Sequence, residues 1–121
     1  MAHILIVEDD ESVRTFTARA LQIDGHTVDQ ADDGDTGLEK VAAKNGRYDL
    51  VLSDIRMPTM DGIAMAREIA KDFPDQKILL MTGFAEQRER ARDVAKIVID
   101  VVQKPFTLAD IRAAVAKALA A

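Results

Sequence analysis

The sequence of 121 residues has no cysteine and no long apolar run. Without cysteine, a disulfide framework, a thiolate metal site and a cysteine nucleophile are all excluded. No apolar run approaches the ~20 residues that a membrane-spanning helix needs. The N-terminal segment Met1–Ile4 also lacks the basic flank and the long apolar core of a signal peptide. We therefore expect a cytoplasmic protein that is not embedded in a membrane.

Basic clusters and linkers are missing as well. The chain has 16 basic and 21 acidic residues, and residues 1–60 hold 6 of the former and 12 of the latter. Neutralising phosphates requires clustered Lys and Arg, so this balance argues against direct nucleic-acid binding. No repeat, low-complexity tract or Pro/Gly-rich linker interrupts the chain, and its length suits one domain, residues 1–121. The acidic excess instead suggests a cation site.

Short apolar runs alternate with stretches of helical periodicity. The runs predict strands at residues 4–7, 27–29, 50–52, 78–81 and 98–102. The periodic stretches predict helices around residues 13–21, 38–42, 63–73, 85–95 and 108–119, with Thr107 as the N-cap of the last. Such alternation predicts an α/β fold with a doubly wound, five-stranded parallel sheet, and the flavodoxin-like strand order 2-1-3-4-5 is expected for so few strands.

Carboxylates follow two strands that this order places side by side. Glu8 and Asp9 follow the first strand, and Asp54 follows the third. Ligands of such sheets bind beyond the carboxyl ends of the strands, at the point where the strand order reverses. Converging carboxylates repel one another unless a cation neutralises them, and an all-oxygen donor set with few protein ligands favours Mg²⁺. Asp10 and Glu11 are interpreted instead as acids at a helix N-terminus.

Two further strand ends add hydrogen-bond donors. Thr82 follows the fourth strand and Lys104 follows the fifth, so both are expected at the same edge of the sheet as Asp54. A carboxylate can act as a nucleophile and form an acyl phosphate. A hydroxyl, an ammonium and a metal ion would position the phosphoryl group and neutralise its charge. The set therefore predicts phosphoryl transfer to Asp54.

The motifs that contain these residues resemble the receiver domain of bacterial two-component response regulators, the CheY-like family. They are Ile6–Asp10, Ser53–Pro58 with Met60–Gly62, Met81–Gly83, and Lys104–Phe106. Each motif is weak alone, but all of them occur in order, and the resemblance runs from Ile4 to about Leu119. The segment Met81–Ala85 and the chain end after the last helix also resemble alphaproteobacterial single-domain regulators of the CpdR type.

The resemblance implies a role for each matching residue. Asp54 would accept a phosphoryl group from a histidine kinase or a histidine phosphotransfer protein, with Mg²⁺ bound and Mn²⁺ able to replace it. Asp9, Asp54 and the backbone carbonyl of Arg56 would hold the metal directly, and Glu8 would hold it through water. Thr82 and Lys104 would bind the phosphoryl group. The Lys104–Pro105 peptide bond would be cis, which proline permits.

The resemblance also implies how the signal leaves the domain. No output domain is expected after the fifth helix, so a separate protein would bind the face formed by helix 4, strand 5 and helix 5. A phosphorylation-dependent dimer is left open. Many receivers have Tyr or Phe three residues before the lysine as a switch coupled to the threonine, but this chain has Val101 there. The signal is then expected to pass through the loop between strand 4 and helix 4, where Phe84 lies.

Two alternatives use other chemistry. An aspartyl-phosphate phosphohydrolase of the haloacid-dehalogenase type would have a second Asp two residues after the nucleophile, where this chain has Arg56. A flavin or nucleotide carrier would have a Gly-rich or Ser/Thr-rich phosphate loop after the first strand, and the acidic segment Glu8–Glu11 would repel a phosphate. A signalling module rather than an enzyme is therefore the preferred interpretation.

Overall fold

The computed structural model describes residues 1–121 and contains one parallel sheet. Its strands are β1 (His3–Val7), β2 (Thr27–Ala31), β3 (Leu50–Asp54), β4 (Ile78–Thr82) and β5 (Asp100–Gln103). Neighbouring strands pair in parallel in the order β2-β1-β3-β4-β5. This confirms the predicted α/β class and strand order.

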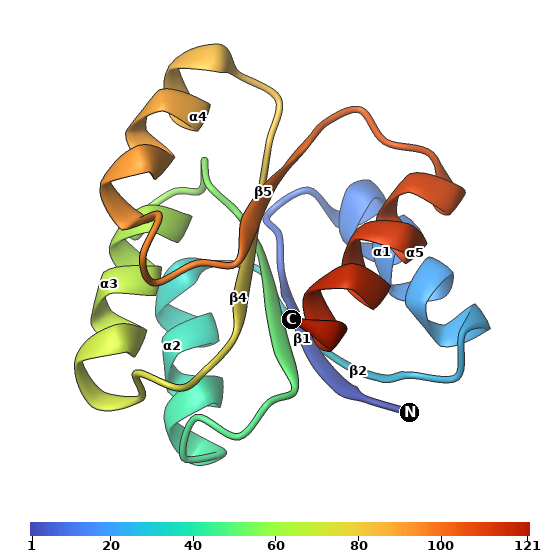
Figure 1. The fold of residues 1–121 in the computed structure, drawn as a ribbon, viewed down its shortest axis with the longest axis horizontal. Helices are drawn as coiled ribbons and strands as arrows, with labels where there is room; N and C mark the ends of the chain where they lie inside the picture. Colours follow the sequence, from blue (N-terminus) through green and yellow to red (C-terminus); the bar gives the residue numbers. More distant parts are fainter.

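Helices cover both faces of the sheet. They are α1 (Glu11–Ile23), α2 (Gly34–Ala43), α3 (Gly62–Asp72), α4 (Ala85–Arg90), the 3₁₀ helix η1 (Ala91–Val94) and α5 (Leu108–Ala120). Figure 1 shows α1 and α5 on one face and α2, α3 and α4 on the other. None of these helices combines the length and the apolar character needed to cross a membrane.

Burial on two faces explains why the central strands are apolar throughout. Along β1, Leu5 and Val7 join a cluster of 17 buried residues on the side of α2 and α3. Ile4 and Ile6 alternate with them and join a cluster of 12 buried residues on the side of α1 and α5. Successive side chains of a strand point to opposite faces, so a strand buried on both faces needs an unbroken apolar run.

Short polar side chains start most of the helices. Asp10 accepts from the backbone N–H of Val13 at the start of α1, as expected for a helix-terminal acid. Asp33 and Asp61 cap α2 and α3 in the same way. Thr107 caps α5 in a capping box with Asp110, which confirms the predicted N-cap. Helix α4 is different, because its N-cap residue is Phe84, whose side chain makes no capping bond.

The structure corrects some predicted boundaries. Strand β5 begins at Asp100, so the strand predicted over residues 98–102 starts too early. Val98 still donates its backbone N–H to the carbonyl of Val94, which makes it the end of the preceding turn. The helix predicted over residues 85–95 is divided into α4 and η1. Helix α2 begins before the predicted 38–42 because Asp33 caps it and Gly34 and Gly37 pack in the interior.

Candidate functional site

A group of three carboxylates lies at the carboxyl ends of β1 and β3. Glu8, Asp9 and Asp54 each offer one carboxylate oxygen, and these oxygens lie within 4.8 Å of one another. The sheet brings them together, because Val7 pairs with Ser53 across β1 and β3. Glu8 is 1% exposed and Asp54 is 8% exposed, whereas Asp9 lies at the surface. The predicted convergence of these carboxylates is confirmed.

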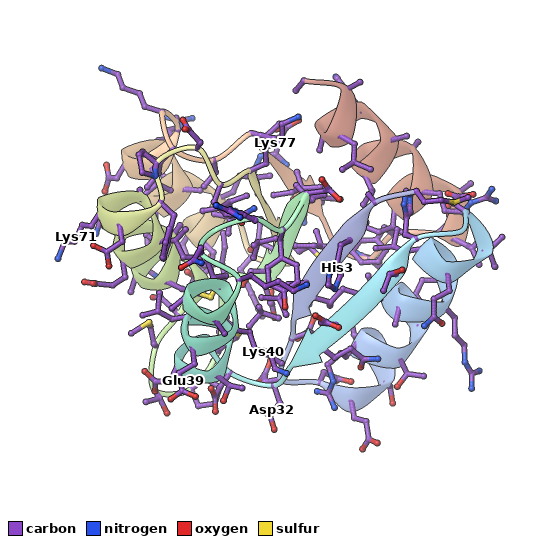
Figure 2. All side chains as sticks on the ribbon, turned by 90° about the horizontal axis from the view of Figure 1, so that it is seen from below. His3, Asp32, Glu39, Lys40, Lys71 and Lys77 are labelled. Atoms are coloured by element: carbon purple, nitrogen blue, oxygen red, sulfur yellow. The ribbon has the colours of Figure 1, made fainter.

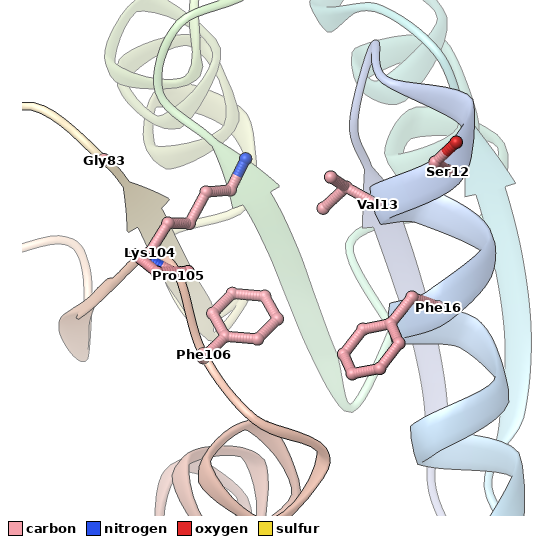
Figure 3. A pocket seen from close by; sticks show the side chains of 7 residues that line it. All are labelled: Ser12, Val13, Phe16, Gly83, Lys104, Pro105 and Phe106. Atoms are coloured by element: carbon pink, nitrogen blue, oxygen red, sulfur yellow. The ribbon is translucent and has the colours of Figure 1, made fainter.

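Lys104 supplies the positive charge of the site. Its Nζ lies 2.6 Å from Oε1 of Glu8 and 3.2 Å from Oδ2 of Asp54. Figure 3 shows its side chain extending toward the carboxyl end of β3. The backbone N–H of Lys104 donates to the carbonyl of Thr82, and the following Lys104–Pro105 bond is cis, as the resemblance implied. The end of β5 therefore delivers an ammonium group to the acids.

The electrostatics of the site are unbalanced. Burial raises the pKa of Glu8, and the charge of Asp54 adds to this, while the contact with Lys104 only partly offsets it. Burial and the neighbouring Glu8 also raise the pKa of Asp9. For Lys104, burial acts to lower the pKa, but Glu8 and Asp54 outweigh it and the pKa is raised. Three carboxylates face one ammonium, and this hard-oxygen donor set with excess negative charge fits a divalent cation such as Mg²⁺.

Backbone contacts fix the two strand ends. Arg14 on α1 donates from Nη1 to the carbonyl of Glu8 at 2.8 Å. Gly62 passes so close to β3 that a Cβ atom there would lie 2.2 Å from the carbonyl oxygen of Asp54. The glycine therefore allows α3 to begin directly beside the buried carboxylate. Sequence reasoning missed Arg14 as a support, because nothing in the local pattern of α1 signals a contact with a strand end.

Thr82 and Arg56 lie at the same end of the sheet, and both contact Phe84. The Thr82 side chain is buried, and its Oγ1 accepts from the backbone N–H of Phe84 at 3.1 Å and donates to the Phe84 carbonyl at 3.3 Å. The Arg56 guanidinium carbon lies 5.1 Å from the centre of the Phe84 ring. The structure thus joins Glu8, Asp9, Asp54 and Lys104, while Thr82 and Arg56 are joined through Phe84. The sequence indicated Phe84 as a residue of the loop that is expected to carry the signal, but it did not predict the contacts of Phe84 with Thr82 and Arg56.

A hollow of about 480 Å³ lies beside Lys104, between α1 and the β5–α5 connection (Figure 3). Phe16 and Phe106 face each other across it, with ring centres 6.4 Å apart. Its other lining residues are Ser12, Val13, Gly83 and Pro105. Lys104 is the one charged residue of the lining, so the hollow extends the site with a mainly apolar wall.

The fold and the site together define a phosphoacceptor module, and comparison with known proteins identifies its family. The family model described as "Response regulator receiver domain" matches residues 4–116. The chain belongs to this family, whose members accept a phosphoryl group in two-component signalling. A phosphodonor kinase is therefore a partner of this class of domain.

Relatives of known name agree with this assignment. The response regulator receiver protein CpdR of Brucella abortus is 38% identical over 111 residues, covering 92% of this chain and 91% of CpdR. The sensor kinase CckA of Brucella abortus is 39% identical over 107 residues, 88% of this chain but 11% of the kinase. The structure of the response regulator TrrA of Thermotoga maritima in complex with Mg²⁺ and BeF superimposes with a TM-score of 0.86 at 33% identity, covering 98% of this chain and 99% of TrrA.

Proposed function

We propose that Asp54 is the residue that accepts the phosphoryl group, and that the donor is a phosphohistidine of a histidine kinase or of a histidine phosphotransfer protein. An Asp54 carboxylate oxygen would attack phosphorus while the phosphorus–nitrogen bond breaks and its electron pair returns to the imidazole. The observation that carries this proposal is the nearly buried Asp54 carboxylate at the end of β3, beside two more carboxylates and the Lys104 ammonium.

The chain's own residues would position the reacting groups. Asp9, Asp54 and the backbone carbonyl of Arg56 would hold Mg²⁺ or Mn²⁺, with Glu8 holding it through water. The bound cation supplies charge neutralisation between Asp54 and the incoming phosphoryl oxygens. Lys104 would donate to one of those oxygens, and the Thr82 hydroxyl would donate to another. The structure of TrrA is a complex with Mg²⁺ and BeF, which supports the binding of a divalent cation and a phosphoryl-like group by a chain of this fold.

We further propose that residues 1–121 act as one receiver domain in the cytoplasm. The relationship to CpdR supports this, because the matched region spans 91% of that receiver protein. The output would then be a separate protein that binds α4, β5 and α5. The domain would act as a switch and not as an enzyme with turnover; Arg56 stands where a phosphohydrolase would have its second Asp.

The test is covalent labelling. The protein is incubated with Mg²⁺ and acetyl phosphate, and its intact mass is measured for wild type, Asp54→Asn and Asp29→Asn. Asp29 is a control, since it is a half-buried aspartate on a strand, β2, and lies outside the site. We expect one hydroxylamine-labile phosphoryl adduct in wild type and in Asp29→Asn, and none in Asp54→Asn. An adduct in Asp54→Asn would contradict the proposal, and repeated hydrolysis of phosphate esters would favour the phosphohydrolase.

A further inference from the structure

We propose that Arg14 is a positioning residue for the cation site. Its guanidinium holds the peptide unit between Glu8 and Asp9, and this unit directs the Asp9 carboxylate toward Glu8 and Asp54. The inference rests on the proposed function, in which Asp9 holds the metal directly. It assigns to a residue outside the acidic cluster a part in how tightly the cluster binds a divalent cation.

Arg14 makes the one hydrogen bond that the Glu8–Asp9 peptide unit has. Its Nη1 donates to the carbonyl oxygen of Glu8 at 2.8 Å, and the backbone N–H of Asp9 donates to no group of the protein. The backbone on either side is held by other bonds, because the N–H of Glu8 donates to the carbonyl of Ala31 and Asp10 caps α1. A peptide unit is planar, so the carbonyl of Glu8 and the N–H of Asp9 turn together. Without Arg14 this unit would be free to rotate between two fixed neighbours.

The direction of the Asp9 side chain depends on this peptide unit. Asp9 lies at the surface, whereas Glu8 and Asp54 are buried. Lys104 pairs with Glu8 and Asp54 but not with Asp9. No cationic side chain therefore orients the Asp9 carboxylate, and its position follows from its backbone. Rotation of the peptide unit would move this carboxylate away from the other two, whose oxygens lie within 4.8 Å of its own.

The geometry of α1 explains why a residue at position 14 reaches the end of β1. The Cα–Cβ bonds of an α-helix tilt toward its N-terminus, so a long side chain in the second turn extends back over the first. Arg14 occupies the second turn, where its backbone N–H donates to the carbonyl of Asp10. Arg14 forms no ion pair, and it lines a polar hollow of about 320 Å³ between α1 and the end of β2. Water can enter this hollow and solvate the Glu8 carbonyl when the guanidinium is removed, so the loss of Arg14 should cost little stability.

A positioning role and a charge role predict opposite effects. A guanidinium repels Mg²⁺, so if Arg14 acted through its charge, removing it would tighten Mg²⁺ binding. If Arg14 acts through the peptide unit, removing it weakens binding, because losing a group that orients a metal ligand typically costs about ten- to a hundredfold in affinity. The charged neighbours that shift the pKa values of Glu8 and Asp9 include Lys104 but not Arg14. The contacts of Arg14 therefore favour the positioning role.

The test measures the Mg²⁺ affinity of the full chain by following amide resonances in an NMR titration. Arg14→Met keeps an unbranched side chain of high helix propensity but removes the guanidinium, and we expect Mg²⁺ to bind about tenfold more weakly. Arg14→Lys keeps a donor and should bind Mg²⁺ more tightly than Arg14→Met. The matched control is Arg19→Met, which removes an exposed arginine of the same helix and should keep the affinity within about twofold, since exposed charges are screened. Unchanged or tighter binding in Arg14→Met, or weaker binding in Arg14→Lys than in Arg14→Met, would overturn the inference.

A double-mutant cycle tests whether Arg14 acts through Asp9. In the Asp9→Asn background, Arg14→Met should weaken the remaining Mg²⁺ binding by less than about twofold, because the ligand that Arg14 positions is already lost. A tenfold loss in both backgrounds would overturn the inference.

Thermal unfolding separates positioning from a role in the fold. The melting temperature of Arg14→Met in metal-free buffer should fall by about 4 °C or less, the effect of one lost hydrogen bond. A much larger fall would give Arg14 a role in the fold instead and would overturn the inference. Absence of Mg²⁺ binding in wild type would overturn the proposed cation site as well, whereas Mg²⁺ binding that Arg14→Met does not weaken would overturn this inference alone.

Discussion

The two ends of the sheet each carry a cluster of ionisable side chains, and the clusters differ in charge balance. At the carboxyl end, the carboxylates of Glu8, Asp9 and Asp54 face the single ammonium of Lys104. At the amino end, the carboxylate of Asp29 on β2 accepts from the Tyr48 hydroxyl at 2.7 Å and lies 2.9 Å from Nε2 of His3. Nζ of Lys44 lies 2.9 Å from the other ring nitrogen of His3, and Figure 2 shows His3 on β1 beside β2.

The balanced cluster stabilises its own charges and the unbalanced one does not. Burial acts to raise the pKa of Asp29, but the hydrogen bonds of Tyr48 and His3 outweigh it, and the pKa is lowered. At the carboxyl end the pKa values of Glu8 and Asp9 are both raised. The amino end is therefore a structural network, and the carboxyl end keeps an electrostatic conflict that a ligand can relieve. Such a local conflict is typical of functional sites.

The largest contrast should come from removing the lysine at each end. Lys104→Met leaves the buried Glu8 and Asp54 without their cation, and we expect the free energy of unfolding at pH 7 to fall by about 3 kcal/mol, since losing one partner of a buried ion pair is costly. Lys44→Met removes an exposed ammonium and should lower it by less than about 1 kcal/mol. Urea unfolding in metal-free buffer measures both values. Similar losses of unfolding free energy in the two variants would contradict the proposed difference in charge balance between the two ends of the sheet.

A smaller contrast, with opposite signs, should come from neutralising one aspartate at each end. Asp29→Asn loses charge-assisted hydrogen bonds, and its side chain is 37% exposed, so stability should fall by about 1 kcal/mol. Asp9→Asn removes a carboxylate that repels Glu8 and should raise stability by about 0.5 kcal/mol without metal. Adding Mg²⁺ should stabilise wild type and Asp29→Asn but not Asp9→Asn, as followed by thermal unfolding. Destabilisation by Asp9→Asn in metal-free buffer would contradict the proposed repulsion.

Much of the carboxyl-end cluster could be predicted from the sequence. Glu8, Asp54, Thr82 and Lys104 each follow an apolar run, and parallel strands place such positions at one edge. The amino-end network could not be predicted, because His3, Asp29, Lys44 and Tyr48 share no strand-end pattern and meet only through the register of β1 with β2 and the path of the α2–β3 loop. Local pattern therefore locates chemistry at strand ends better than it locates networks made by loops.

The start of β5 and the contact between Arg56 and Phe84 were not predicted either, because both depend on contacts between distant parts of the chain. Val98 is as apolar as a strand residue, yet its backbone N–H bonds back to Val94, and this depends on where η1 ends. The contact of Arg56 with Phe84 joins two loops, and no periodicity spans both. Tertiary contacts determine these features, whereas burial on two faces makes the central strands predictable from the sequence alone.

The smallest effect is the pH dependence, which should have opposite signs at the two ends. Glu8 has a pKa raised above its ordinary 4.5, so the folded state binds its proton more tightly, and its contribution to stability falls as the pH rises from about 4.5 through the folded pKa. Asp29 has a pKa lowered below its ordinary 3.8, so its contribution is full above 3.8 and is lost as the pH falls through the folded pKa. The unfolding free energy of wild type minus that of Glu8→Gln isolates the contribution of Glu8. The unfolding free energy of wild type minus that of Asp29→Asn isolates the contribution of Asp29. Both differences are measured from pH 3 to pH 8 in metal-free buffer. The first difference should decline with pH and the second should increase. Saturating Mg²⁺ should flatten or reverse the first slope and leave the second unchanged, because only the carboxyl end would bind the cation in its ionised form.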